Sequence, residues 1–398
     1  MNIVIASREI GSVKHLCFDG DSWEWSEDFD PLSVFWGFEN SRDIRESLCS
    51  LGIEIESLSQ TKFGKAIIPL LQNSEDIPWR YCIPRESYVE YIKYLVDQLW
   101  CVINDEANSY YITTFLRNRG ILQGLSTPIV DNDVIKNIVA TVNQPAHQTL
   151  GTLKRFKADK NGKCEKTIYS LSSSKTGRMT VKSGPNILTL RKDFRKIFQS
   201  SYDDGMILEV DVSSIEPRVA LSLTGKTYTD DVYDTIISDL AGVKIDRQTA
   251  KIATLSSIYG ASHHSLSSYV PATVNSKALI DKIRKYFMVD EIEKILNDQV
   301  AERGYMSNTH GRKIFTTTPS MNYLIQSSAV DVAFDIFEKI IEKSQSMKIR
   351  FKTLYLIHDA IIIDIHKDDF NIFKSICKDG FESEKVHATF PVKLKEIS

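Results

Sequence analysis

Residues 206–216 read MILEVDVSSIE, and residues 354–364 read LYLIHDAIIID. Each stretch contains a short apolar run, which predicts a buried strand. An aspartate lies where each predicted strand ends or turns: Asp211 in the first stretch and Asp359 in the second. Two carboxylates that come together from separate strands form a site for a pair of divalent cations. The two stretches therefore predict a sheet with metal-binding chemistry at one end.

Residues 247–260, RQTAKIATLSSIYG, predict a helix between these two strands. Arg247, Lys251 and Tyr259 follow one another at steps of four and eight residues, which keeps them on one broad face. Cations on a helix opposite a two-metal site indicate a triphosphate held between them. Taken singly, each feature also has a plain structural explanation: a strand-end cap, a turn residue and an exposed helix face.

Charge is distributed unevenly along the chain. The 398 residues are 42% hydrophobic and 25% charged, with a net charge of −3, which is ordinary for a soluble protein of more than one domain. Residues 151–200, however, hold 13 basic and 3 acidic residues. Such an excess is typical of a phosphate-binding surface, although a solvated basic surface explains it equally well.

The six cysteines are scattered, without a CxxC pair or a Cys/His cluster. This argues against a zinc site and predicts reduced thiols. The N-terminus lacks the long apolar stretch of a signal peptide, and no apolar run reaches membrane-spanning length. We therefore expect a cytoplasmic protein without a membrane partner.

Hydrophobic periodicity and turn residues predict the order of elements. Residues 1–85 are predicted to form a small α/β unit with strands at 13–18, 32–38 and 53–58 and a helix at 41–51. A helix is expected over 86–119, ended by Gly120. Later elements are expected as helices at 131–156, through much of 228–300, at 322–344 and at 368–380, a hairpin at 305–317 and a last strand at 387–394.

Five segments stand in a telling order along the chain: Thr176-Gly177-Arg178, Asp211 to Arg218, Arg247 to Gly260, Asn322 to Gln326, and His358-Asp359. In this order they resemble the polymerase core of the family A DNA polymerases, the bacterial DNA polymerase I type. The likeness spans residues 176–398 and extends more faintly over 86–175.

The resemblance implies an α+β right-hand polymerase fold, with an antiparallel palm sheet, helical fingers and a reduced helical thumb. Its parts would be a helical linker and short thumb at 86–175, the palm at 176–227 and 302–398, and the fingers at 228–301. The implied activity is template-directed DNA polymerisation from a primer, and the implied partners are primer–template DNA and dNTPs. We expect a monomer in the cytosol of a bacterium or a phage-infected host, and the resemblance names no processivity partner.

The resemblance also implies a role for each motif residue. Asp211 and Asp359 would anchor two Mg²⁺ ions, for which Mn²⁺ can substitute, and the Val212 carbonyl would add a backbone ligand. Arg247 and Lys251 would grip the triphosphate, and Lys251 would also protonate the leaving pyrophosphate. The remaining assignments are nucleotide binding for Leu255, Tyr259, Glu216 and His358, and DNA binding for Arg178, Arg218, Asn322 and Gln326. Within these sets Glu216 would exclude a ribose 2′ hydroxyl, His358 would position the primer end, and Arg178, Asn322 and Gln326 would read the minor groove.

The chain departs from the family pattern at several positions. Leu255 stands where Phe or Tyr is usual, Ser256 replaces a usual Gly, and Ala360 stands where Glu usually follows the aspartate. These changes put dideoxynucleotide handling and sugar fidelity in doubt. The thumb region, 121–175, is shorter than usual, which predicts low processivity.

Residues 1–85 are too few for a complete proofreading exonuclease. Asp19, Asp21 and Asp43 are candidate metal ligands, but the segment contains no Asp-x-Glu signature. We therefore expect an inactive exonuclease remnant and no 3′–5′ proofreading.

Two alternative functions remain. A single-subunit RNA polymerase relative would share the aspartates and the helix Lys and Tyr, although Glu216 argues against it. A polymerase-like DNA-binding protein that has lost catalysis is favoured by Leu255, Ser256 and Ala360 and opposed by the retained aspartates and cations.

Overall fold

The structure is a computed structural model that describes residues 2–5, 15–18, 21–27, 34–38, 41–51, 53–70, 79–141, 147–226, 231–240, 242 and 244–397. The chain divides into two compact units, Met1–Thr113 and Thr114–Ser398. The division falls after residue 113, so the helix expected over 86–119 belongs mostly to the N-terminal unit. Within the described residues, no helix has both the length and the apolar character needed to cross a bilayer.

The N-terminal unit contains a four-stranded sheet in the order β3-β2-β1-β4. Strand β1 pairs antiparallel with β2 and parallel with β4, so the predicted α/β character is confirmed. Its elements are β1 (Asn2–Ile5), β2 (His15–Phe18), β3 (Trp23–Ser26), β4 (Val34–Phe38), α2 (Ser41–Ser50), α3 (Lys62–Ile67), α4 (Trp79–Cys82) and α5 (Arg85–Asn104). The candidate acid Asp19 lies outside the described residues, as does the side chain of Asp43.

Two predictions for this unit are wrong. Residues 53–58 do not form a strand, because a capping box between Ser57 and Gln60 starts a 3₁₀ turn at Leu58–Gln60 instead. The long helix breaks at Asp105, and not at Gly120, which lies inside α6 (Glu106–Gln123). An added Cβ at Gly120 would contact nothing, so this glycine imposes no break.

The C-terminal unit is built on an antiparallel sheet in the order β12-β13-β9-β16. Strands β9 (Gly205–Val212), β12 (Phe351–Ile357) and β13 (Ala360–His366) confirm the strands predicted from the two apolar stretches. Strand β16 (Val392–Glu396) pairs with the outer edge of β9. Because Ile357 pairs with Ala360, His358 and Asp359 form a two-residue hairpin turn between β12 and β13.

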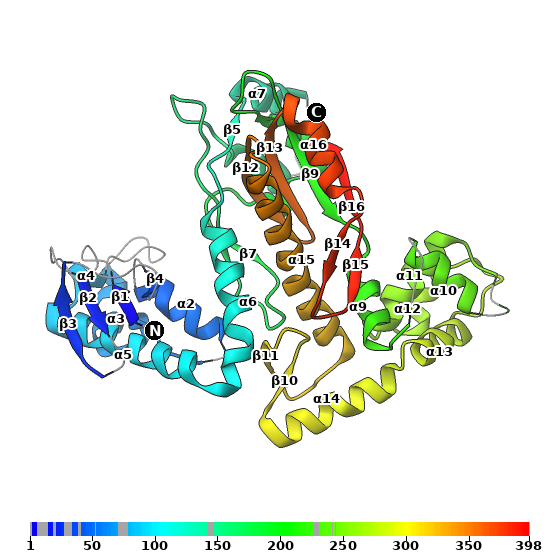
Figure 1. Cartoon of the computed structure of the whole chain (residues 1–398), viewed down its shortest axis with the longest axis horizontal. Coiled ribbons are helices and arrows are strands. Elements are labelled where there is room, and N and C mark those ends of the chain that lie inside the picture. The colour runs from blue at the N-terminus through cyan, green and yellow to red at the C-terminus, as the bar shows by residue number, and fades with distance from the viewer. Residues whose placement is uncertain are drawn as a thin grey trace. The chain divides into compact units, whose positions relative to one another are not determined.

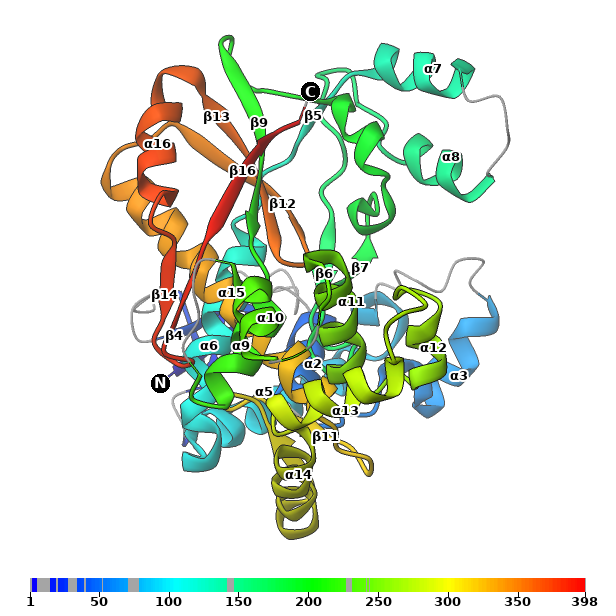
Figure 2. The ribbon, with the colours of Figure 1, turned by 90° about the vertical axis from the view of Figure 1, so that its right-hand side faces the viewer.

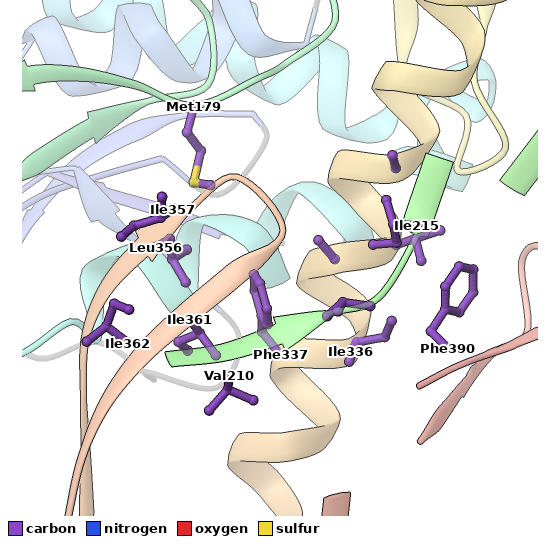
Figure 3. Close-up of a cluster of buried hydrophobic side chains, with 14 of the residues drawn as sticks. Met179, Val210, Ile215, Ile336, Phe337, Leu356, Ile357, Ile361, Ile362 and Phe390 are labelled. Atoms are coloured by element: carbon purple, nitrogen blue, oxygen red, sulfur yellow. The ribbon is translucent and has the colours of Figure 1, made fainter. Parts of the chain in front are cut away.

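Helix α15 (Met321–Ser346) supplies much of the core of this unit (Figures 1 and 2). In the close-up of the core, Ile336 and Phe337 of α15 gather with Val210 of β9 and Ile361 of β13 (Figure 3). All four side chains are fully buried. The sheet that carries both aspartates is thereby fixed against a long helix.

A group of helices lies beside the C-terminal end of β9 (Figure 1). These are α9 (Ile215–Leu223), α10 (Val232–Asp239), α11 (Arg247–Ile258), α12 (His263–Ser267), α13 (Ser276–Tyr286) and α14 (Val289–Arg303). The hairpin of β10 (Tyr305–Ser307) and β11 (Lys313–Phe315) follows. The other elements of the unit are β5 (Ile129–Val130), α7 (Asn132–Thr141), α8 (His147–Lys154), β6 (Ile168–Ser170), β7 (Thr180–Ser183), β8 (Phe198–Gln199), α16 (Phe370–Cys377), β14 (Phe381–Ser383) and β15 (Ala388–Phe390).

A buried polar network ties the β10–β11 hairpin to α6 and α15. The carboxylate of Asp331, which is 0% exposed, accepts hydrogen bonds from Asn118 and Asn308, both at 2.7 Å, and from Arg312 at 3.3 Å. Burial would raise the pKa of Asp331, but the Arg312 guanidinium and the other donors outweigh it and hold the pKa below its ordinary value. Gly177 packs on Arg312: a Cβ added there would lie 2.4 Å from the guanidinium carbon.

Candidate active site

A cavity of about 490 Å³ opens at the C-terminal end of β9. Seven segments line it: the loop before β7, the β9–α9 junction, helices α10, α11 and α15, the β12–β13 turn and strand β16. The residues predicted from sequence that line it are Arg178, Asp211, Glu216, Arg247, Lys251, Leu255, Gln326, His358 and Asp359. The structure thus brings most of the predicted site into one cavity.

The two aspartates meet across neighbouring strands. Asp211 pairs with Ala360, the residue directly after Asp359, in the β9–β13 ladder. The amide of Val212 donates to the Asp359 carbonyl at 2.9 Å, which fixes the turn against the end of β9. Val212 as a whole is fully buried and does not line the cavity.

The carboxyl groups of Asp211 and Asp359 are partly buried and lie close to other negative charges. Burial, together with the charge of Asp211, raises the pKa of Asp359 to about 6. Burial and the nearby Glu209 carboxylate raise the pKa of Asp211, and Lys192, Lys393 and Lys251 oppose this shift. Like charges held together in this way favour either a shared proton or a bound cation.

Replacing Asp359 with Asn is expected to raise the melting temperature by a few degrees at pH 8 in a chelating buffer. The native pKa of about 6 exceeds the ordinary 3.8, so the native state binds the proton more tightly. That stabilisation is complete below the ordinary pKa and is lost as the pH rises through about 6, a loss of no more than about 3 kcal/mol. Differential scanning calorimetry at pH 8 and pH 5 should show a gain that shrinks at the lower pH. The exposed Asp379→Asn variant serves as control, and an equal gain at both values would contradict the electrostatic cause.

Helix α11 presents its predicted face to the cavity. Arg247, Lys251 and Leu255, at successive four-residue steps, all line it. Arg247 is held by the Asp231 carboxylate at 2.7 Å and lies 5.2 Å over the ring of Tyr233. The helix begins at Asp246, whose side chain accepts from the Thr249 amide at 2.7 Å.

Glu216 lies at the centre of a side-chain clamp. One of its carboxylate oxygens accepts from Arg178 Nη2 at 2.7 Å, and the other accepts a short hydrogen bond from the Tyr259 hydroxyl. Tyr259 is the C-cap of α11; it does not line the cavity but contacts the site through this bond. Glu216 is therefore paired with both Arg178 and Tyr259.

Two non-glycine residues at the cavity wall adopt a left-handed backbone conformation. Ser214, the N-cap of α9, has φ +55°, and His358 in the hairpin turn has φ +56°. Such conformations persist where the surrounding structure demands them, and they gather at functional sites. Partial loss of solvation and the charges of Arg178 and Arg195 lower the pKa of His358, so its imidazole is neutral at pH 7.

Two predicted DNA-binding residues are placed apart from the cavity. Asn322 lies one helical turn before Gln326 on α15 but is absent from the lining. Arg218 is 3% exposed and donates to the Thr389 carbonyl at 3.4 Å, so its guanidinium is enclosed between α9 and β15. This burial contradicts a direct role for Arg218 in binding DNA.

Sequence analysis missed several residues of the cavity. Lys393 lines it from β16, Tyr233 from α10, and Ser213 from the turn after β9. The Ser213 hydroxyl is buried and has no hydrogen-bond partner among the described residues. Only the pairing of β16 with β9 brings Lys393 to the site, and no local pattern signals that register.

Residues 117–396 match the sequence profile of DNA polymerase family A. The chain is 25% identical over 254 residues to DNA polymerase I of Aquifex aeolicus (strain VF5), covering 56% of this chain and 43% of that protein. It is 22% identical over 269 residues to DNA polymerase I of Streptococcus pneumoniae serotype 4, covering 58% and 30% of the two proteins. The fold is similar to that of the POL domain of Pol1 from M. smegmatis, solved in complex with DNA primer-template and dNTP. That likeness has a TM-score of 0.56 at 13% identity and covers 91% of this chain and 82% of that one. Since the profile match covers well over half of the chain, the chain belongs to DNA polymerase family A.

Proposed function

We propose that this chain is a template-directed DNA polymerase that adds dNTPs to the 3′ end of a primer. The observation that carries the proposal is one cavity lined by Asp211 of β9 and Asp359 of the β12–β13 turn together with Arg247 and Lys251 of α11. Family membership supports the same activity. The fold of residues 114–398 supports a palm built on the β12-β13-β9-β16 sheet and fingers built on α10–α14.

The carboxylate pair fits divalent metal ions of the Mg²⁺ type. Its donors are oxygens, it lies in a cavity, and the pKa of each carboxyl is raised by burial and a neighbouring negative charge. Among the described residues no third His, Cys, Asp or Glu joins the pair in a metal-binding group. The remaining ligand positions would fall to water, phosphate oxygens and backbone, the arrangement Mg²⁺ commonly accepts. When bound, two such ions would lower the pKa of the primer hydroxyl and neutralise the departing pyrophosphate.

The chain's own residues would position the reactants. In the reaction, a bond forms between the primer 3′ oxygen and the α-phosphorus, and the bond to pyrophosphate breaks. Arg247 would hold the triphosphate after exchanging Asp231 for phosphate oxygens, and Lys251 would hold it and give a proton to the leaving pyrophosphate. Neutral His358 would stand at the primer end beside Asp359. Arg178 and Gln326 would contact the minor groove of the end base pair, which reports its geometry and not its sequence.

Glu216 would select the sugar, because its carboxylate, held by Arg178 and Tyr259, occupies the cavity wall. The Glu216→Ala variant is expected to use rNTPs at least about tenfold better relative to dNTPs, since a space for the 2′ hydroxyl opens. Single-nucleotide incorporation with dNTP and rNTP measures the ratio. The Glu216→Gln variant keeps the volume and should keep most of the selectivity. An unchanged ratio in Glu216→Ala would remove Glu216 from this role.

We propose no proofreading function for residues 1–85, on the ground that they lack an Asp-x-Glu signature. The short segment at 121–175, with α7 and α8, would act as a reduced thumb and limit processivity. Leu255 would pack near the incoming sugar in place of an aromatic ring.

The deciding experiment is primer extension on undamaged template, with dNTPs and rNTPs supplied separately and with Mg²⁺ or Mn²⁺. Extension with dNTPs supports the proposal. Extension with rNTPs alone would favour an RNA polymerase-like activity. Tight primer–template binding without extension in either metal would favour a polymerase-like DNA-binding protein.

A further inference from the structure

Lys393 is a cation at the site that neither the motif order nor helix α11 accounts for. In the β16–β9 ladder it lies directly opposite Asp211. Residues directly opposite each other in an antiparallel pair point to the same face of the sheet. Lys393 is exposed and lines the cavity, so its ammonium shares a face and a solvent space with the Asp211 carboxylate.

Most of the other cations at the site already form an ion pair with a carboxylate. Arg178 is paired with Glu216, Arg247 with Asp231, and Lys192 with Glu209 at 3.1 Å. Among the described residues, no carboxylate oxygen lies within 4.0 Å of Lys393 Nζ. Lys393 therefore faces the cavity with bonding capacity for an anion.

The strand order of the sheet indicates which part of a bound nucleotide would lie near Lys393. Asp211 lies on β9, which pairs on one side with β13, the strand after the turn of His358 and Asp359, and on the other side with β16, which carries Lys393. In phosphoryl transfer the attacking and leaving oxygens lie roughly in line on opposite sides of phosphorus. If the primer hydroxyl lies on the Asp359 side, the leaving group points toward β16.

We propose that Lys393 is a phosphate-binding residue that contacts the β- and γ-phosphates of the incoming nucleotide and the pyrophosphate product. This inference rests on the proposed polymerase function of the same cavity. Lys393 and Lys251 would hold the polyphosphate from two sides, one from the sheet and one from α11. An ammonium binds phosphate as a point charge, so Arg can replace Lys here more readily than Ala can.

The test compares Lys393→Ala with Lys393→Arg and with Lys395→Ala. Lys395 is the matched control, because it is an exposed lysine on the same strand and face, opposite Glu209, but does not line the cavity. Single-turnover incorporation across a dNTP series, and pyrophosphorolysis across a pyrophosphate series, give the two apparent dissociation constants. Lys393→Ala is expected to weaken both roughly tenfold, with primer–template affinity unchanged. Lys393→Arg should restore most of the loss, and Lys395→Ala should match the wild type.

Calorimetric binding of inorganic tripolyphosphate separates this inference from the polymerase proposal. If the wild type does not extend primers but binds tripolyphosphate through Lys393, the polymerase proposal fails and the phosphate site stands. If the wild type extends primers and Lys393→Ala leaves both nucleotide and pyrophosphate dependence unchanged, Lys393 is not a phosphate ligand. Loss of primer–template affinity in Lys393→Ala alone would also overturn the inference, since it would place the contact on the DNA.

Discussion

Primer extension by the Asp359→Ala variant is expected to fall at least about a thousandfold, and extension by Asp211→Ala to fall as far. Each carboxylate would supply half of a metal-binding pair, and removing either one leaves a single anchor in the cavity. A thousandfold corresponds to about 4 kcal/mol of transition-state stabilisation, which is within what metal ions supply in phosphoryl transfer. Single-turnover extension at saturating dNTP and Mg²⁺ measures the effect.

Measurements of folding and of DNA binding distinguish a variant that misfolds from one that folds but no longer catalyses extension. Removing a half-buried carboxyl whose charge is repelled by its neighbour should not lower the melting temperature at pH 8. Primer–template binding by both variants should remain, because neither substitution removes a cation. The exposed Asp379→Ala variant should extend primers normally. Near-normal extension by Asp211→Ala or Asp359→Ala would refute the assignment of the pair as metal anchors.

Replacing Asp331 with Ala is expected to lower the free energy of unfolding of the C-terminal unit by about 3 kcal/mol or more. Its carboxylate receives hydrogen bonds from Asn118, Asn308 and Arg312 at a position with 0% exposure. Without it, the buried Arg312 loses its counter-charge and two amides lose their acceptor. Urea titration followed by far-UV circular dichroism measures the change.

A matched variant on the same helix tests whether the network or the charge alone matters. Asp335 lies one turn after Asp331, is 9% exposed, and is paired with Arg117 at 3.4 Å and with Lys339 at 3.8 Å. Asp335→Ala should cost about 1 kcal/mol, because its partners lie closer to solvent. All five tryptophans lie between residues 23 and 100, so tryptophan fluorescence gives a separate reading of the N-terminal unit. Equal losses in the two variants would contradict a special role for the Asp331 network.

The parts of the fold that could be predicted from sequence are those with strong local signals. The apolar runs around Asp211 and Asp359 predicted β9, β12 and β13, because short apolar runs bounded by turn residues are typical of buried strands. The helical period over 88–102 likewise predicted α5. The prediction failed at 53–58, where an apolar and acidic alternation resembled a strand but a local capping box formed a turn. It also failed at Gly120, since helix α6 tolerates a glycine where nothing packs against it.

The candidate site, too, could be predicted only where a local motif signals its residues. Residues carried by a motif, such as Lys251 on α11 or His358 in the turn, lie where the motif order predicts. Long-range pairing was not predicted: Lys393 reaches the site through the register of the last strand, and the predicted residues Arg178 and Glu216 form an ion pair across a separation of 38 residues. Arg218 was misassigned because sequence spacing does not reveal which side of α9 is enclosed.

The clamp around Glu216 and the pair of Arg247 with Asp231 have a common consequence for how a substrate enters. In the resting site these groups are already bonded to one another. If the proposed function holds, an arriving nucleotide would have to replace these resting contacts with contacts of its own, so the net gain from each replaced contact would be small. A correct nucleotide would replace more of them than a mismatched one. Release of a wrong nucleotide would return the site to the bonded arrangement seen in the structure.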